Sequence, residues 1–400
     1  MIGKWPVERS DLHSNQFIRK EQIMLNRRII TAFLMLGLLG IGAATLSCAA
    51  EAKFQDSFNV DKTTLADKGS NTYMVLKPGY KLILTDGKDT LMITVLDETK
   101  VVDGVKTRIV EERETKGGKL YEVSRNYFAI DKATGDIYYF GEDVDIYDAD
   151  GKVTGHEGRW LSGLNKAKFG LMMPGKPRVG SRYYQEMAPE VAMDRAEVVS
   201  TSETVEVPAG TFKNCLKTRE SSSLESGAED KLFAPGVGLL KDGDFKLEKI
   251  EVALRDTALP DLVAKTFKAA FPNAEILKVD VDAEEGVAVY DLEFKDGATE
   301  KETDITADGT MLEFTIVVGT EDVPAAAMKT VRQAAEGAAI GRIEYIEISY
   351  EAKNGRVVKL PETVINYAVE MTRGDKTSEI VVNPDGTVLE PARWDDEAEQ

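Results

Sequence analysis

The chain has 400 residues and a formal net charge of −19, because 69 Asp and Glu residues outnumber 50 Lys and Arg residues. A chain of this length can form two or three domains, each with its own hydrophobic core. An acidic surface repels nucleic-acid phosphates and anionic lipid head groups, which argues against nucleic acid as a partner. The same charge is also typical of a surface that only keeps an exported protein in solution.

The first distinctive segment covers residues 24–52. Arg27 and Arg28 precede an uncharged apolar run from Ile29 to Leu46, and small residues follow. A cationic start, an apolar segment and small side chains, in that order, are typical of an export signal. We therefore predict an exported protein, either in the cell envelope or secreted. Residues 1–23 are charged and aperiodic, and we expect them to be a mis-assigned start or a disordered tail.

The sequence leaves three fates open for this segment. The run from Thr45 to Cys48 resembles a bacterial lipobox, which implies that Cys48 is lipidated and anchors the protein to a membrane; a lipobox usually has Leu in place of Thr45. Ordinary signal-peptide cleavage at a site such as Ala50-Glu51-Ala52 is the second possibility. The third is an uncleaved anchor, since the run is close to the ~20 apolar residues that span a bilayer.

A β domain is predicted for residues 71–254, after a polar, aperiodic tether at 53–70. Pairs such as Asp86-Gly87, Gly117-Gly118 and Asp150-Gly151 separate β-branched and aromatic runs. Such pairs are the strongest short-range signals for hairpins. No amphipathic helix of useful length interrupts the runs, so we expect a mainly antiparallel domain.

Two motifs of this domain are specific. They are Val207-Pro208-Ala209-Gly210-Thr211-Phe212 and Ala234-Pro235-Gly236-Val237-Gly238-Leu239. They resemble a recurrent group of uncharacterised exported bacterial proteins, over about residues 70–250. The resemblance implies a fold and a compartment but no activity. The Pro and Gly residues set tight bends, so we assign them no chemistry.

The remainder repeats itself in units 259–314 and 323–390, followed by an acidic tail at 391–400. The strand 290–294 of the first unit aligns with 367–371 of the second. Each unit starts with an amphipathic helical stripe and continues as a strand meander. A helix of this kind can cover the apolar face of its own sheet. The predicted fold class is therefore α+β, with an N-terminal β domain and two C-terminal αβββ modules.

The first unit resembles the PepSY-like group, which is described as similar to β-lactamase inhibitor proteins. The resemblance is carried by Ala269-Ala270-Phe271-Pro272-Asn273-Ala274, the strand Tyr290–Phe294 and the turn Asp308-Gly309. The second unit lacks the Phe-Pro-Asn motif and inserts residues 353–361. The resemblance implies a non-catalytic extracytoplasmic module that binds or inhibits a partner protein, such as a peptidase or a sensor.

No catalytic arrangement is apparent. A serine hydrolase needs a base beside its nucleophile, but the exported part has one histidine, His156, in a loop-like context where a solvated side chain is the simpler interpretation. Cys215 has no partner if Cys48 is lipidated or removed, and a structural thiol is favoured over a nucleophile. One His and one Cys cannot supply a zinc site. We predict no enzyme activity and no cofactor.

One acidic segment partly fits the pattern of a calcium loop. Four residues fit positions 3, 5, 6 and 12 of such a loop: Asp148, Asp150, Gly151 and Glu157. Position 1 would be Ile146, which has no side-chain oxygen. Asp143 and Asp145 lie nearby, but a hairpin turn with solvated carboxylates is the preferred interpretation, and we predict no metal.

Two further sets of residues have both a functional and a structural interpretation. Glu111 and Glu112 are adjacent and would face opposite ways on a strand, so they cannot share a substrate. Six aromatic residues could line a lipophilic cavity, although such residues more often fill a core. They are Tyr138, Tyr139, Phe140, Trp160, Tyr183 and Tyr184.

The function that these patterns favour is the binding or inhibition of an envelope protein through the PepSY-like modules. It is supported by the tandem units, by acidic strands such as Thr299–Thr306 and by the lack of a catalytic group. The alternative is a carrier of lipid or of a small apolar ligand, with the N-terminal sheet curved around an apolar cavity.

Lipidation is tested by the intact mass of the protein purified from bacterial membranes, before and after lipase or hydroxylamine treatment. We expect the mass of residues 48–400 plus acyl chains. An unlipidated mass that begins near Lys53 would contradict lipidation at Cys48 and indicate a secreted protein.

Overall fold

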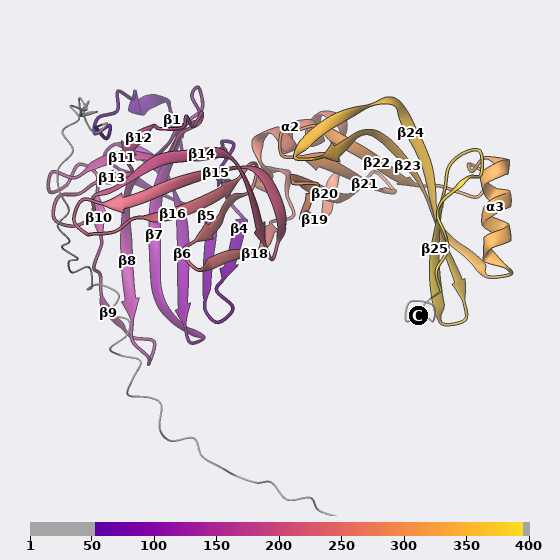
Figure 1. Ribbon diagram of the computed structural model, residues 1–400, viewed down its shortest axis with the longest axis horizontal. Helices are drawn as coiled ribbons and strands as arrows, with labels where there is room; N and C mark the ends of the chain where they lie inside the picture. The colour runs from indigo at the N-terminus through magenta and orange to yellow at the C-terminus, as the bar shows by residue number, and fades with distance from the viewer. Residues whose placement is uncertain (1–52, 395–400) are drawn as a thin grey trace, which may run out of the picture. The chain divides into compact units, whose positions relative to one another are not determined.

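The computed structural model describes residues 53–394. The predicted export segment and Cys48 lie outside these residues, as does the end of the acidic tail. Within the described range, no helix is long and apolar enough to cross a membrane. About 60% of the structure is strand and 8% is helix, so the predicted α+β class is wrong and the described chain is mainly β (Figure 1).

The elements have the following bounds. The N-terminal strands are β1 (Leu65–Ala66), β2 (Gly69–Ser70), β3 (Val75–Leu76), β4 (Tyr80–Thr85), β5 (Thr90–Val102), β6 (Val105–Lys116), β7 (Lys119–Asp131), β8 (Ile137–Tyr147), β9 (Val153–Gly155), β10 (Trp160–Leu161), β11 (Lys168–Met173), β12 (Arg182–Tyr184), β13 (Glu186–Met187), β14 (Asp194–Val207), β15 (Gly210–Ser222), β16 (Glu229–Ala234), β17 (Gly238–Asp242) and β18 (Phe245–Val252). The C-terminal strands are β19 (Glu275–Glu284), β20 (Val287–Asp296), β21 (Thr299–Thr306), β22 (Met311–Val317), β23 (Ala339–Lys353), β24 (Arg356–Arg373), β25 (Lys376–Val382) and β26 (Val388–Glu390). The helical segments are η1 (Lys62–Thr64), η2 (Asp256–Ala258), α2 (Asp261–Ala270) and α3 (Ala325–Ala335).

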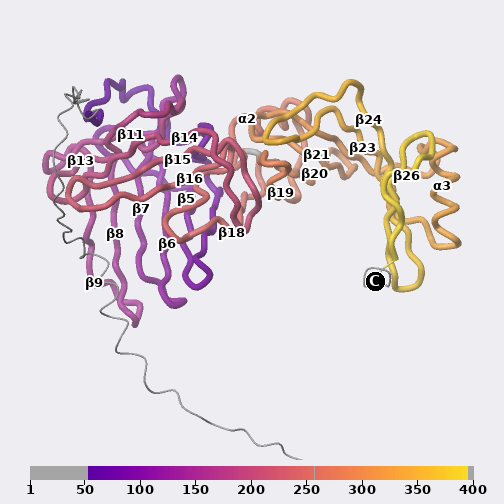
Figure 2. Tube along the Cα trace, viewed as in Figure 1, coloured from indigo at the N-terminus to yellow at the C-terminus, as the bar shows by residue number. Residues whose placement is uncertain are grey.

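The N-terminal strands form one 16-stranded antiparallel sheet, apart from the small β2–β3 pair. The sheet curves strongly and nearly closes on itself (Figure 2). Alternation in sequence explains the two faces: along β4, every second side chain is buried. Gly117 and Gly118 both have positive φ at the tight β6–β7 turn, a conformation that glycine adopts without strain.

Residues 53–70, which the sequence suggests to be a tether, contain η1, β1 and β2. Strand β1 pairs with β7, so that Leu65 lies opposite Asp131. The nearly buried guanidinium of Arg108 forms an ion pair with the Asp67 carboxylate and donates a hydrogen bond to the Asp67 carbonyl oxygen. This segment is therefore tied to the curved sheet by backbone and side-chain contacts.

The C-terminal strands form one eight-stranded sheet in chain order, β19 to β26. Each helix precedes four strands rather than three, and β22 pairs with β23 to join the two halves of the sheet. The prediction of two C-terminal αβββ modules is therefore wrong. The helices have only 10 and 11 residues, too short to form a layer comparable with the sheet.

Helix α2 covers one face of the first four strands of this sheet. Phe267 is buried, and its ring contacts that of Phe294 at 5.0 Å between centroids. Phe271 contacts Phe294 at 4.4 Å and Phe314 at 5.6 Å. This aromatic cluster continues into the core of the curved sheet, where the Tyr290 hydroxyl donates to the Gly236 carbonyl oxygen at 2.6 Å. Helix α3 covers a separate core that includes Val331, outside the aromatic cluster.

We expect Phe267→Ala to lower the free energy of unfolding by about 3–5 kcal/mol, because it removes a large side chain from a packed core. Urea denaturation would measure the change. The control is Leu262→Ala on the same helix, where the side chain is 50% exposed and a change of under about 1 kcal/mol is expected. Equal losses in the two variants would contradict the described packing of α2.

Candidate functional site

Cys215 and His156, the two candidate catalytic residues, do not form part of a catalytic arrangement. The Cys215 side chain is fully buried, and burial raises the pKa of its thiol to about 12, which disfavours the reactive thiolate. The exposed His156 ring lies 3.0 Å from the Asp145 carboxylate and 2.8 Å from the Val144 carbonyl oxygen. Neither contact includes a hydroxyl or thiol nucleophile.

The acidic segment compared with a calcium loop is a hairpin turn. The Asp148 carboxylate accepts hydrogen bonds from the backbone N–H groups of Asp150 and Lys152, both at 3.0 Å. Asp143 is bonded to Lys100 at 2.6 Å and to Arg159 at 2.9 Å. Among the described residues, no group of three or more His, Cys, Asp or Glu side chains is arranged to hold a metal ion.

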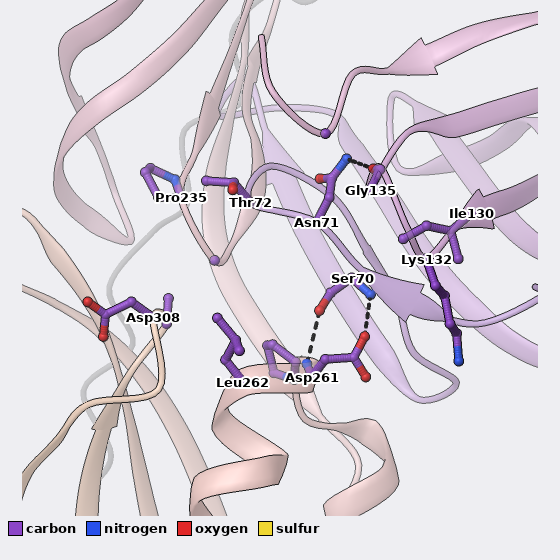
Figure 3. A pocket seen from close by; sticks show the side chains of 14 residues that line it. Ser70, Asn71, Thr72, Ile130, Lys132, Gly135, Pro235, Asp261, Leu262 and Asp308 are labelled. Atoms are coloured by element: carbon purple, nitrogen blue, oxygen red, sulfur yellow. Dashed lines mark hydrogen bonds between the residues drawn. The ribbon is translucent and has the colours of Figure 1, made fainter.

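A hollow of about 560 Å³ lies beside the start of α2 (Figure 3). Several of its polar groups bond to one another: Asp261 N–H donates to Ser70 Oγ, and the Asp261 carboxylate accepts from the Ser70 N–H, each at 2.9 Å. Asn71 donates to the Gly135 carbonyl oxygen at 2.9 Å. Lys77 forms an ion pair with Asp261. These bonds stabilise the local structure. The groups that form them are therefore already used within the protein and do not point to a ligand site.

The strongest candidate is the face of the C-terminal sheet that is opposite α2. Because side chains alternate along a strand, burial of Tyr290, Leu292 and Phe294 beneath α2 turns Asp291 and Glu293 to the other face. The same alternation applies to the acidic residues of β19, β21 and β22. We call this surface the open face.

Four carboxyl groups form a row across the open face. Strand register places Asp280 opposite Asp291, Asp291 opposite Asp304, and Asp304 opposite Glu313, on four consecutive strands. Directly opposed residues lie about 4.5–5.5 Å apart at Cβ, and like charges in that position destabilise a sheet. We call Asp280, Asp291, Asp304 and Glu313 the carboxylate row.

The carboxylate row has little compensating charge. Lys278 is bonded to Asp280 and to Glu293 at 2.8 Å, at the β19 edge. Within residues 53–394, Asp291, Asp304 and Glu313 form no ion pair with a Lys or Arg side chain. The Asp291 Oδ1 atom is buried without a hydrogen bond of ordinary geometry, and the side chain that the Asp291 carboxyl meets is another acid, Glu302. The centre of the row is therefore an uncompensated acidic surface.

The protonation of the row reflects this environment. Partial burial, and to a lesser extent the negative charge of Glu313, raises the pKa of Asp304 to about 8. Partial burial and the neighbouring Asp291 raise the pKa of Glu302 to about 7. The pKa values of Asp291 and Glu313 are also raised, mainly by burial. A nearby cation would favour the charged forms of these four carboxyl groups, which are Asp291, Glu302, Asp304 and Glu313.

An apolar strip adjoins the row. Ile348 lies opposite Glu313, and Ile346 lies opposite Thr315, so both side chains are on the open face. Val364 lies opposite Ile348 on β24 and is 40% exposed. Apolar side chains next to polar ones are typical of protein-binding surfaces, which have an apolar centre and a polar rim.

The β23–β24 hairpin limits the open face at one end. Gly355 N–H donates to the Glu285 carbonyl oxygen at 2.7 Å, at the turn between β19 and β20. The Asn214 side chain donates to the Gly355 carbonyl oxygen at 2.8 Å. Strands β23 and β24 arch back from α3 towards β19 and β20 (Figure 1). The long insertion noted in the second unit, residues 353–361, thus forms the tip of this hairpin and the start of its return strand, β24.

Part of this site was predicted from the sequence. The acidic strand Thr299–Thr306 is β21, and it contributes Glu302 and Asp304. The carboxylate row itself was missed, although Asp280-Val281-Asp282-Ala283-Glu284 alternates acidic and apolar residues. That alternation is a signal for a one-sided acidic strand.

No family model matches the chain, and no curated protein matches it. The chain is similar to a DUF2874 family protein from Bacteroides uniformis ATCC 8492, with 16% identity over 35% of this chain and 91% of that chain, at a TM-score of 0.26. A BLIP-like protein from Bacteroides fragilis NCTC 9343 shows 16% identity over 33% and 84%, at 0.24. A suspected periplasmic protein from Bacteroides eggerthii DSM 20697 shows 15% identity over 34% and 88%, at 0.26. At these TM-scores and identities, the similarities assign neither a fold nor a function to this chain.

We expect Asp304→Asn to stabilise the protein at pH 8–9, by on the order of 1 kcal/mol, and to change little at pH 4. The folded-state pKa of about 8 is above the ordinary value of 3.8, so the folded state binds more protons between these values. Wild-type stability therefore falls as the pH rises through this window.

Urea denaturation at pH 4–9 would measure the slope of the free energy of unfolding against pH for each variant. Glu248→Gln, at an exposed position of β18, is the control; slopes that match in wild type and Asp304→Asn would contradict the raised pKa.

Proposed function

We propose that this protein binds a cationic segment of another protein on the open face of its C-terminal sheet, and that it acts without catalysis. The observation that carries the proposal is the register that places four carboxyl groups side by side on four strands. A chain segment with Lys or Arg side chains would supply the charges that this surface lacks.

The energetics favour a cationic occupant. Opposed carboxylates repel one another when they are ionised, and partial burial strengthens that repulsion because the local dielectric constant is below that of water. A bound ammonium or guanidinium group removes the repulsion and adds charge-assisted hydrogen bonds. The excess negative charge would also accelerate association at low ionic strength.

The apolar strip supports a protein rather than a free ion as the occupant. Ile346, Ile348 and Val364 offer an apolar surface that a metal ion or a small polar cation would not use. Removal of such a surface from water contributes roughly 25 cal/mol per Å². A segment with both basic and apolar side chains would use the strip and the carboxylate row together.

The partner is proposed to be an envelope protein. This location rests on the predicted export signal at 24–52, and the class of partner, a peptidase or a sensor, rests on the resemblance of residues 259–314 to the PepSY-like group. Inhibition would follow if the bound segment were part of the partner's active site. Lipidation at Cys48 would confine the search to partners at the membrane.

The alternative of a lipid carrier has less support. The apolar interior of the N-terminal sheet includes a cavity of about 80 Å³, lined by Tyr80, Val95 and Phe128 among others. Sites for drug-sized ligands are about 300–1,000 Å³. Side chains fill most of the space that an acyl chain would need, so we do not propose this function.

The test uses a fluorescent octapeptide rich in Lys and Arg, with an Asp- and Glu-rich octapeptide as its counterpart. We expect the wild-type protein to bind the basic peptide and not the acidic one. The triple variant D291N/D304N/E313Q should bind it at least tenfold more weakly, because it removes three carboxyl groups that would ionise against the bound cations. Fluorescence anisotropy would measure both affinities. Binding should be tighter at pH 9 than at pH 6, because Asp304 and Glu302 ionise in this interval.

The matched control is E98Q/E190Q/E248Q, which removes three carboxyl groups from exposed positions of the N-terminal sheet and its turns. If the control loses as much affinity as the triple variant, binding follows net charge and the proposed surface is wrong. Capture from envelope extract, with the wild type and both triple variants as baits, then identifies the natural partner. A partner retained equally by all three baits would also count against the open face.

A further inference from the structure

One stretch of the N-terminal domain departs from the acidic composition of the chain. The 28 residues from 158 to 185 contain six Lys or Arg residues and no Asp or Glu, although Asp and Glu make up 69 of the 400 residues of the chain. Four of these basic side chains are exposed and form no ion pair within residues 53–394. They are Lys166, Lys168, Lys176 and Arg178. An otherwise acidic protein thus has a local surface that attracts anions.

The first of two loops in this stretch, residues 162–167, keeps a leucine in water. Gly163 N–H donates to the Ala167 carbonyl oxygen at 2.9 Å, and Ala167 N–H donates to the Leu164 carbonyl oxygen at 2.8 Å, so the loop is closed by its own backbone. Leu164 is 57% exposed. The two residues after it have positive φ, 48° and 67°, a conformation that is unfavourable for residues other than glycine. Packing within the described chain does not explain this exposed leucine.

The second loop, residues 174–181, has a similar composition. Backbone N–H groups near its two ends donate to Asp136 Oδ1 and to the Val198 carbonyl oxygen, each at 2.8 Å, so both ends are fixed. Val179 is 65% exposed and directly follows Arg178. Each loop therefore presents one apolar side chain beside basic side chains.

Both loops border the same end of the curved sheet. Ser162 Oγ donates at 2.8 Å to Asp103, in the β5–β6 turn, and the second loop is bonded to Asp136, in the β7–β8 turn. Strands β6 and β7 are antiparallel neighbours; the first turn precedes β6 and the second follows β7, so the two turns lie at one end. We call Leu164 and Val179, together with the four basic residues, the docking surface.

The N-terminal segment of the described chain lies at this same end. Gln55 N–H donates to the Arg182 carbonyl oxygen, and Tyr184 N–H donates to the Gln55 carbonyl oxygen, each at 2.9 Å. Arg182 begins β12, directly after the second loop. Further along the segment, Lys62 forms an ion pair with Asp103 at 2.6 Å. The segment thus connects the surroundings of both loops.

The predicted membrane anchors are only a few residues upstream. Cys48 precedes Lys53 by five residues, and a fully extended chain of that length spans at most about 18 Å. The apolar run that ends at Leu46 is two residues further. If either of these attaches the protein to a membrane, the end of the sheet that carries the docking surface is held close to the lipid.

We propose that the docking surface lies on a membrane that contains anionic phospholipid, with Leu164 and Val179 in the head-group region and the basic side chains at the lipid phosphates. Basic side chains are attracted to an anionic membrane within a Debye length, and apolar side chains between them add burial. An acidic protein partner would account for the charges, but not for their position beside the predicted anchor. The proposal concerns the N-terminal sheet and does not depend on the function proposed for the open face.

The experiment uses the chain from Ala52 onward, because residues 52–400 form one compact unit without the predicted anchor. Leu164→Cys carries an environment-sensitive dye, and the fully buried Cys215 stays unlabelled. Vesicles of phosphatidylcholine with phosphatidylglycerol are compared with vesicles of phosphatidylcholine alone. At about 0.15 M salt the Debye length is about 8 Å, which screens the acidic residues elsewhere. We expect a saturable blue shift with the anionic vesicles and at least tenfold weaker binding to the neutral ones.

Variants test whether the four basic residues are responsible. K166Q/K168Q/K176Q/R178Q should bind the anionic vesicles at least tenfold more weakly. The matched control K152Q/K246Q/K265Q/K329Q removes four exposed lysines elsewhere and should bind almost as tightly as the wild type. A dye on Leu389→Cys, at a position of β26 that is 47% exposed, should show no blue shift.

The outcomes separate clearly. Equal binding to anionic and neutral vesicles, or no binding, overturns the proposal, as does an equal loss of affinity in the matched control or an equal blue shift at position 389. Tighter binding of an Asp- and Glu-rich octapeptide through the same four residues would also overturn it, in favour of an acidic protein partner. Thermal unfolding shows whether each variant is folded; if the quadruple variant unfolds, the lipid comparison and the two dye positions still decide.

Discussion

The packing of aromatic side chains beneath α2 is the interaction on which the C-terminal site depends. Phe267 and Phe271 contact Phe294, and the residues two and four positions before Phe294 are buried on the same side. Because side chains alternate along a strand, the acidic residues between these apolar ones must lie on the opposite face. A slip of one residue in register would bury carboxylates beneath the helix, at a prohibitive cost.

The acidic residues of this protein differ in their physical situation. The carboxylate row lies on a partly exposed sheet face beside an apolar strip, which suits a large cationic partner. Glu112 lies instead inside the curved sheet, where it lines a small cavity whose wall is otherwise mostly apolar. In the carboxylate row the fold holds like charges together without enough cations, and such arrangements are enriched at functional sites.

Local pattern was sufficient for most strands and for both helices. The Gly117-Gly118 turn joins two strands as its residues suggest, and the stripe that contains Val263 and Phe267 is buried in α2. The error was in the fold class: each helix is followed by four strand-like runs, and the strands of both units pair into one sheet. Pairing of β22 with β23 involves residues far from the local motifs, so a single sequence does not reveal it.

The sequence by itself determined which residues alternate, where the chain turns, and that the chain is strongly acidic, because these properties depend only on neighbouring residues. The tertiary structure alone decided which carboxyls meet. Asp280, Asp291, Asp304 and Glu313 become neighbours through the register of four strands. The N-terminal sheet acquires an interior only because it curves, and curvature arises from twist and bulges summed over many strands. Strand register and sheet closure are long-range properties, which a single sequence does not show.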